Sequence, residues 1–137
     1  MFTVSAKGTY GLLAVVELAR NYHGSSIQIR DIARRRSIPQ HYLEQILVLL
    51  KKAGLVESFR GAQGGYALAQ DPREMTVRQV LSALEGPLQL ISDERRGSSL
   101  DFFWNDLQER MAELLEVPIE SLLTEEQRRN QRFVYTI

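Results

Sequence analysis

The chain has 137 residues, with 17 Lys or Arg against 17 Asp or Glu, and no cysteine. This length predicts one well-packed domain with a small extension. The absence of cysteine excludes disulfides, thiolate metal sites and cysteine-ligated iron–sulfur clusters. No apolar run approaches the length of a membrane span, and the first residues lack the charged and hydrophobic regions of a signal peptide. We therefore expect a cytoplasmic protein that does not enter a membrane.

The two halves of the chain differ in charge. Residues 1–70 hold nine Lys or Arg and four Asp or Glu, a net charge of +5, whereas residues 71–137 hold eight and thirteen, a net charge of −5. This asymmetry suits an N-terminal part that faces nucleic-acid phosphates and a C-terminal part that faces away from them.

Residues 5–22 predict a helix that is apolar on most sides and therefore mostly buried. Lys7 and Tyr10 lie near its start and could reach a DNA phosphate, although a lysine in this place is usually only solvated. Residues 27–29 predict a short strand, and residues 30–36 predict a short second helix. Three consecutive arginines end that helix, where they fit either a solvated face or a phosphate contact.

A third helix is predicted to begin at Pro39, whose fixed φ and missing N–H suit a first helical turn. Apolar residues recur at the i, i+3, i+4, i+7 spacing of one buried face: Leu43, Ile46, Leu47 and Leu50. Polar residues share the opposite face: Gln40, His41, Glu44, Gln45, Lys51 and Lys52. Such side chains can read base edges and hold phosphates, which favours a DNA recognition helix. The same pattern also fits an ordinary amphipathic surface helix.

A glycine-rich hairpin is predicted directly after this helix. Gly54 suits its C-terminal cap, and two β-prone runs follow at 55–59 and 66–68. Arg60 and Gly61 begin the tip between them, whose glycines permit a tight turn. A slim basic hairpin of this kind can place an arginine in a narrow minor groove. The alternative is a glycine-rich hairpin with a solvated arginine.

A fourth helix is predicted to start at Thr76, which forms a capping box with Gln79, and to end at Gly86. Its apolar stripe consists of Val77, Val80, Leu81 and Leu84. Residues 88–99 have no regular period and predict an exposed loop.

A long helix is predicted beyond this loop and must end before Pro118. Its apolar residues are spaced 4, 3, 4 and 3 apart, as in a coiled-coil seam: Leu100, Trp104, Leu107, Met111 and Leu114. We expect this seam to pack against a second copy of the chain in a homodimer, with packing inside the monomer as the alternative. Thr124 with Gln127 predicts one more helical turn, and residues 133–137 predict a terminal strand or docked tail.

Three stretches carry a resemblance to a known family. They are SAKGTYGLLAVVELA at 5–19, YLEQIL at 42–47 and GLVESFRGAQGGYAL at 54–68. Together they closely resemble the Rrf2 family of bacterial winged helix-turn-helix transcription regulators. The fold expected is mainly α with a small β-wing: residues 1–86 form the winged helix-turn-helix domain, and residues 87–137 form a dimerisation helix and a C-terminal tail. The resemblance implies a homodimer with each recognition helix in a major groove.

The resemblance also assigns roles to residues of this chain. The recognition helix would contact bases and nearby phosphates, the wing would enter the minor groove, and the first helix would touch the DNA backbone. The expected DNA-binding residues are Lys7, Tyr10, Gln40, His41, Tyr42, Glu44, Gln45, Lys51, Arg60 and Gly61. Pro39 and Gln40 stand where serine is frequent in the family, so a different preferred DNA sequence is expected.

Sensing is expected to differ from that of the cluster-binding members of the family. Those members place three cysteines between the fourth helix and the long helix, and residues 88–100 have none. No cofactor and no metal are therefore expected. The C-terminal sequence resembles that of a cysteine-metabolism repressor in the family, which takes its signal through an enzyme of cysteine synthesis. This similarity implies control of cysteine or sulfur metabolism through a partner protein, with a small-molecule signal as the alternative.

The leading hypothesis is a sequence-specific transcriptional regulator, acting as a repressor, that binds double-stranded DNA as a homodimer on a palindromic operator. The alternative is a winged-helix scaffold that binds proteins and no specific DNA sequence. Salt dependence would distinguish them, because phosphate contacts make affinity fall steeply with salt. An enzyme is not expected, since His23 and His41 lie on separate elements and the acidic pairs at 93–94 and 125–126 are adjacent residues in polar stretches.

Overall fold

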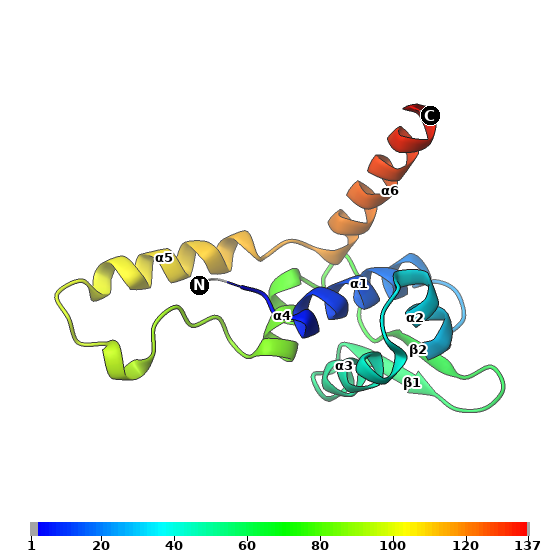
Figure 1. Ribbon diagram of the computed structural model, residues 1–137, viewed down its shortest axis with the longest axis horizontal. Helices are drawn as coiled ribbons and strands as arrows, with labels where there is room; N and C mark the ends of the chain where they lie inside the picture. Colours follow the sequence, from blue (N-terminus) through cyan, green and yellow to red (C-terminus); the bar gives the residue numbers. More distant parts are fainter. Residues whose placement is uncertain (1–2, 137) are drawn as a thin grey trace.

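The computed structural model describes residues 3–136, with side chains for residues 3–131 (Figure 1). The elements in chain order are α1 (Ala6–Arg20), α2 (Ile29–Arg36), α3 (Gln40–Lys52), β1 (Val56–Phe59), β2 (Gly65–Leu68), α4 (Val77–Glu85), the 3-10 helix η1 (Asp93–Arg95), α5 (Asp101–Leu114) and α6 (Ile119–Thr136). Among the helices of residues 3–136, none is both long and apolar enough to cross a bilayer.

Helix α1 forms the centre of the winged part of the fold, and α2, α3 and α4 pack around it (Figure 1). Ala14 and Val15 of α1 are fully buried. The predicted inner face of α3 is also fully buried, at Leu43, Ile46, Leu47 and Leu50. The helical period therefore placed the core correctly, and it leaves the opposite face of α3 in solvent.

Strands β1 and β2 form the predicted hairpin in an antiparallel register that pairs Val56 with Leu68 and Phe59 with Gly65. Gly54 adopts a φ of +77°, the left-handed conformation that ends α3. The short strand predicted beside the wing is a single bridge, in which Ile27 and Tyr66 exchange two backbone hydrogen bonds of 2.9 and 2.8 Å. The wing is thereby joined to the segment that precedes α2.

Helices α1 and α4 cross closely at Gly11. A β-carbon built at Gly11 would lie 2.1 Å from Cδ1 of Leu84 and 3.4 Å from Cγ2 of Ile46. Both of these side chains belong to the buried core, so neither can simply swing into solvent. The glycine therefore allows the backbone of α1 to approach α4.

The Gly11→Ala variant is expected to lower the free energy of unfolding by about 1 to 2 kcal/mol. Overpacking a core costs about 1 to 3 kcal/mol, and the 2.1 Å contact with Leu84 places this variant in the upper part of that range. The higher helix propensity of alanine offsets about 1 kcal/mol of the cost. Urea denaturation measures the difference, with Thr9→Ala on the exposed side of α1 as the control. An unchanged or raised stability would contradict the tight crossing.

Helix α4 begins at the predicted capping box. The hydroxyl of Thr76 accepts from the Gln79 backbone N–H, and the Thr76 N–H donates to the Gln79 side chain. The N–H of Val77 donates to the Val117 carbonyl at 2.9 Å, which satisfies another donor of the first turn. The segment between α5 and α6 is thus attached to the start of α4.

The C-terminal segment differs from the sequence-based prediction. Instead of a separate turn starting at Thr124 and a strand over 133–136, α6 runs continuously from Ile119 to Thr136, and residue 137 lies outside the described residues. The polar stretch that follows Leu123 is rich in Glu, Gln and Arg, which are good helix formers, and Glu125 pairs with Arg128 and Arg129. A helix that is already propagating overrides the weak β-propensity of a few terminal residues.

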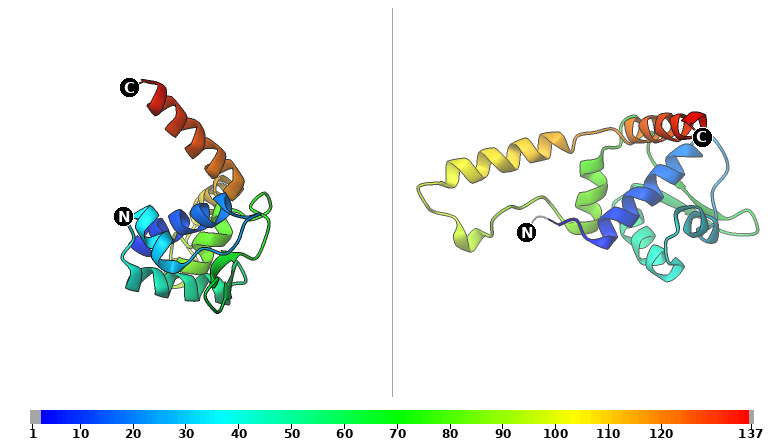
Figure 2. Two further views of the ribbon diagram at one scale, coloured as in Figure 1. Left: turned by 90° about the vertical axis from the view of Figure 1, so that its right-hand side faces the viewer. Right: turned by 45° about the horizontal axis from the view of Figure 1, so that its top comes forward.

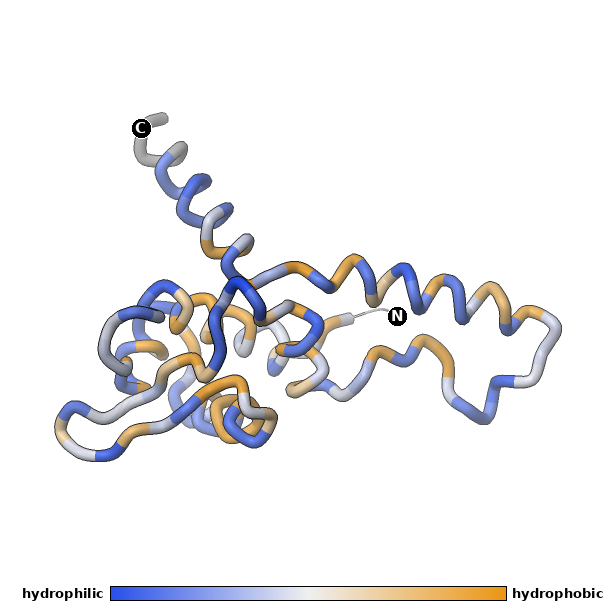
Figure 3. Tube along the Cα trace, turned by 180° about the vertical axis from the view of Figure 1, so that it is seen from behind, coloured by the Kyte–Doolittle hydropathy of each residue, from blue (hydrophilic) through white to orange (hydrophobic). Residues whose placement is uncertain are grey.

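Helix α5 matches the predicted long helix but extends away from the winged part (Figures 1 and 3). It contains no buried residue, and Phe102 and Leu114 are 71% and 75% exposed. It is held mainly from the preceding loop, where the Leu90 N–H donates to Gln108 and Arg96 donates to Asn105. In the single chain, α5 therefore presents an apolar surface with no partner on much of its length.

Candidate nucleic-acid interface

The exposed face of α3 carries the polar residues that the sequence predicted for base contact. Gln40, His41, Glu44 and Gln45 are all exposed. They lie on the side of the helix opposite the buried leucines and isoleucine, because both sets follow the 3.6-residue period. The face therefore has amide, imidazole and carboxylate groups free to approach a base edge.

The start of α3 is fixed by a tight turn after α2. Ser37 adopts the left-handed conformation with a φ of +54°, and the Ile38 N–H donates to the Ala33 carbonyl at 2.9 Å. Ile38 is buried, and Pro39 caps α3 with an extended backbone. The turn reverses the chain between the two helices, which gives the helix-turn-helix arrangement.

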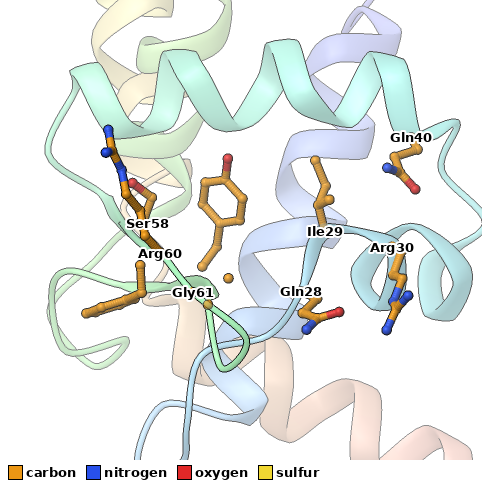
Figure 4. A pocket seen from close by; sticks show the side chains of 11 residues that line it. Gln28, Ile29, Arg30, Gln40, Ser58, Arg60 and Gly61 are labelled. Carbon is orange, nitrogen blue, oxygen red and sulfur yellow. The ribbon is translucent and has the colours of Figure 1, made fainter.

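A hollow of about 450 Å³ lies between the start of α2, the start of α3 and the part of the wing next to its tip (Figure 4). Gln40 and Arg30 lie at one end of it, and Ser58 and Arg60 lie at the other (Figure 4). Among residues 3–131, no carboxylate pairs with Arg30 or Arg60. Two unpaired guanidinium groups therefore flank a concave surface beside α3, which is suited to an anionic backbone.

Gln28 and Arg30 were not predicted as site residues, yet both line this hollow. The sequence indicated only the start of a helix at Arg30. Its place depends on the bridge between Ile27 and Tyr66, which brings the segment before α2 against the wing. Gln28 strengthens that attachment by donating to the Ala62 carbonyl. A long-range backbone contact thus brings Arg30 to this surface. The only feature of the sequence that pointed to Arg30 was the net positive charge of residues 1–70.

Tyr10 and Tyr42 lie together between α1 and α3. Their rings meet edge to face, with centroids 5.7 Å apart and planes at 75°. Tyr10, Tyr42 and Lys7 are all half-buried, so they present only part of each side chain to solvent. The aromatic pair ties the first half of α1 to the first turn of α3.

Lys51 connects the end of α3 to the wing. Its ammonium donates to the Ser58 hydroxyl at 2.6 Å, and the remaining ammonium protons stay available to a phosphate. At the hairpin tip, Gly61 is exposed and has a φ of +95°, which glycine adopts without strain. Gly61 lines the hollow together with Arg60 and with Ser58, the hydrogen-bond partner of Lys51.

The three consecutive arginines at the end of α2 contact carboxylates within the chain. Arg34 pairs with Asp31 at 3.3 Å, and Arg35 pairs with Glu17 at 3.2 Å. Arg36 pairs with Glu17 at 2.9 Å and also reaches α6. Their first role is thus structural, in contrast to the unpaired Arg30 and Arg60.

The predicted seam residues lie along α5, away from this interface. Leu100 and Leu114 are exposed, whereas Trp104, Leu107 and Met111 are half-buried. Met111 lines a pocket together with Leu81 of α4 and Leu90 of the preceding loop. The two histidines stay apart, His23 in the turn after α1 and His41 in α3. Within the described residues, no group of three or more His, Cys, Asp or Glu side chains could hold a metal ion.

Comparison with known proteins gives the family. Residues 4–125 match the Rrf2 family model, described as an iron-dependent transcriptional regulator. The chain is 39% identical to the HTH-type transcriptional regulator CymR of Bacillus subtilis over 94 residues, which cover 66% of this chain and 68% of CymR. It is 32% identical to the HTH-type transcriptional regulator IscR of Klebsiella pneumoniae over 119 residues, which cover 82% of this chain and 73% of IscR.

Solved structures agree with this assignment. The structure of CymR, the global cysteine regulator of B. subtilis, superposes with a TM-score of 0.82 at 32% identity, covering 91% of this chain and 98% of that one. The structure of T. potens IscR gives a TM-score of 0.77 at 35% identity, covering 91% of this chain and 88% of that one. The expected fold, mainly α with a small β-wing, is confirmed by this likeness. The relatives are named as regulators and not as enzymes, which also agrees with the prediction from the sequence.

The family description mentions iron, and the residues of this chain do not fit an iron–sulfur cluster. Such a cluster is held mainly by cysteine thiolates, and the sequence has no cysteine. A cysteine-ligated iron centre therefore cannot form in this chain. The matched family model, the relatives and the winged helix-turn-helix geometry agree on one identity: the chain belongs to the Rrf2 family and is a DNA-binding transcriptional regulator.

Proposed function

We propose that the chain is a sequence-specific regulator in which α3 enters the major groove and the wing contacts the adjacent minor groove. The observation that carries this proposal is the exposed polar face of α3 beside the hollow flanked by Arg30 and Arg60. A helix of this diameter fits the major groove, and a guanidinium suits the negative potential of a narrow minor groove. Lys7, Tyr10 and Lys51 are proposed to contact the DNA backbone.

The regulator is proposed to act as a homodimer through α5. Leu100, Trp104, Leu107, Met111 and Leu114 form the proposed seam, and the lack of any buried residue in α5 supports it. Large exposed apolar surfaces on a soluble chain mark interaction sites. Residues 1–86 then form the DNA-binding part and residues 87–137 the part that dimerises. A two-fold axis implies a palindromic operator with half-sites about one helical turn apart.

Whether the chain represses or activates transcription, and which genes it controls, are proposed from its relatives. One structural relative is described as the global cysteine regulator of its organism, which supports control of cysteine or sulfur metabolism here. Repression is the proposed direction, since a dimer bound on a palindrome within a promoter blocks access to it. The signal is proposed to come from a partner protein, such as an enzyme of cysteine synthesis, or from a small molecule. We propose that this signal acts on the acidic C-terminal half of the chain.

Selection of binding sites from genomic fragments of the source organism tests this proposal. Purified metal-free protein should enrich a palindromic motif, and affinity for that motif should fall steeply with salt because phosphate contacts release counterions. The genes beside the enriched sites then test the assignment to sulfur metabolism. Absence of any enriched motif, combined with weak and salt-independent DNA binding, would favour a protein-binding scaffold instead.

Glu44→Ala is expected to change base preference more than affinity. The exposed carboxylate can accept a hydrogen bond from cytosine N4, so its loss should cost about 1 to 3 kcal/mol at one base position and little elsewhere. Affinities for a set of single-base variants of the selected site measure this effect. Equal loss on every sequence would contradict a role in base readout.

A further inference from the structure

A buried carboxylate holds the end of α2. Glu17, in the middle of α1, is 1% exposed. One of its oxygens accepts from Nε of Arg36 at 2.9 Å, and the other accepts from Nη1 of Arg35 at 3.2 Å. A buried charge is tolerated only when it is paired and hydrogen-bonded. Glu17 therefore fixes the orientation of both arginines.

Arg36 also reaches across to α6. Its Nη1 and Nη2 atoms donate to the two carboxylate oxygens of Glu126 at 2.6 and 2.9 Å. The pair is bidentate, a geometry that fixes direction as well as distance. Hydrogen bonds from Arg36 hold the pKa of Glu126 below its usual value, so the carboxylate stays charged at neutral pH. One guanidinium, 11% exposed, thus joins α1, α2 and α6.

Arg36 lies directly before the turn that sets the start of the recognition helix. It is the last residue of α2, and Ser37, Ile38 and Pro39 separate it from Gln40, the first residue of α3. The left-handed Ser37 and the buried Ile38 leave this turn little freedom. The turn is therefore a short and constrained connection between Arg36 and the first turn of α3.

Helix α6 lies on the opposite side of α1 from α3, so it does not belong to the DNA-facing surface (Figures 1 and 2). Its first turn is anchored in the core by Ile119 and Leu123. Glu126 lies about one helical turn beyond Leu123, where it meets Arg36. Since α6 follows α5 in the chain, this contact connects the proposed dimer helix with the helix-turn-helix.

We propose that Glu126, acting through Arg36, is a positioning residue for DNA binding that makes the placement of α3 depend on the docking of α6. The proposal rests on the proposed function of α3 as the recognition helix. The bidentate contact fixes the direction of the Arg36 guanidinium relative to α6, whatever net stability the pair adds, and this directional constraint is what the proposal uses.

The matched pair Glu126→Gln and Glu125→Gln tests this role. Both variants remove one negative charge from the same turn of α6, but Glu125 pairs only with Arg128 and Arg129 of its own helix among the described residues. Glu126→Gln is the primary variant, because deleting the Arg36 side chain would also remove the shortest of the three arginine contacts of the buried Glu17. Glutamine keeps the size of the side chain and weakens the contact with Arg36.

Two measurements on each variant are needed. We expect Glu126→Gln to lower affinity for the selected DNA site about tenfold, a typical coupling between separate sites. We also expect faster amide hydrogen exchange over residues 37–45 in the free protein, since the turn and the first turns of α3 lose their support. Glu125→Gln should match the wild type in both measurements. Arg36→Lys keeps a charge beside Glu17 without the bidentate fork, and should change both measurements as Glu126→Gln does.

The inference is overturned if Glu126→Gln binds the site with wild-type affinity and exchanges normally over residues 37–45. It is also overturned if faster exchange is confined to α6, or if both glutamine variants lose the same affinity, which would show a general effect of charge. If the wild type binds no specific sequence, the proposed function fails. Hydrogen exchange on the free protein then still decides whether Glu126 positions α3.

Discussion

Replacing Leu107 by glutamate is expected to convert the protein to a monomer and to lower its affinity for the selected palindrome by about 10²- to 10⁴-fold. Leu107 occupies the centre of the proposed α5 seam, and a charge buried between two apolar helices has no partner there. A monomer engages one half-site at a time, so it loses the gain that comes from binding two linked half-sites together. Analytical ultracentrifugation and DNA titration measure the two effects.

Two further variants separate dimerisation from damage to the monomer. Leu114 is 75% exposed in the single chain, so Leu114→Glu should leave the fold intact and still weaken the dimer if a partner covers it. Glu109 lies on another side of α5, and Glu109→Gln should leave the dimer unchanged. Dimers that persist at low concentration in both leucine variants would place the dimer interface elsewhere.

Arg60→Ala is the second variant with a large expected effect on DNA binding. The side chain stands where the tip of the wing begins, beside the hollow, and among residues 3–131 no carboxylate pairs with it. Loss of a groove contact should cost about 1 to 3 kcal/mol, roughly a five- to 150-fold fall in affinity. Fluorescence anisotropy with the selected DNA site, at several salt concentrations, measures the change and its salt slope.

Controls for Arg60 separate shape from charge. Arg60→Lys keeps the charge but hydrates more strongly and lacks the flat guanidinium, so an intermediate affinity is expected. Arg73→Ala removes an equal charge from an exposed arginine that pairs with Asp71 in the segment before α4, away from the hollow. An equal loss of DNA affinity in Arg73→Ala and Arg60→Ala would show that Arg60 contributes only its charge and not a contact that depends on its position in the wing.

Local pattern was enough to predict most of the winged fold. The buried face of α3 follows from the spacing of Leu43 and its apolar neighbours, and the start of α4 follows from the pairing of Thr76 with Gln79. These features depend on residues within one or two helical turns of each other, which is the range over which periodicity and capping act. The continuous α6 was not predicted, because the β-prone residues at 133–136 follow a long run of strong helix formers, and a helix that is already propagating overrides their weak preference.

The residues of the candidate site also fall into two groups, those that the sequence predicted and those that only the structure shows. The polar face of α3 and Arg60 of the wing were predicted from the sequence, because each is carried by a single element. Arg30 was missed, since only the bridge between Ile27 and Tyr66 brings the start of α2 to the wing. The roles predicted for these residues in DNA binding stay predictions, which the variants above are designed to test.

By itself, the sequence determined the helices and turns of the winged part, and that no cysteine can hold a cluster. Only the tertiary structure decided what each charge does. Glu17 lies in an apolar helix and Arg36 in a basic run, and no local pattern connects them with Glu126, which is 90 residues further along the chain from Arg36. Burial of Glu17 makes its pairing with Arg36 necessary, and burial is a property of the packed molecule and not of any segment.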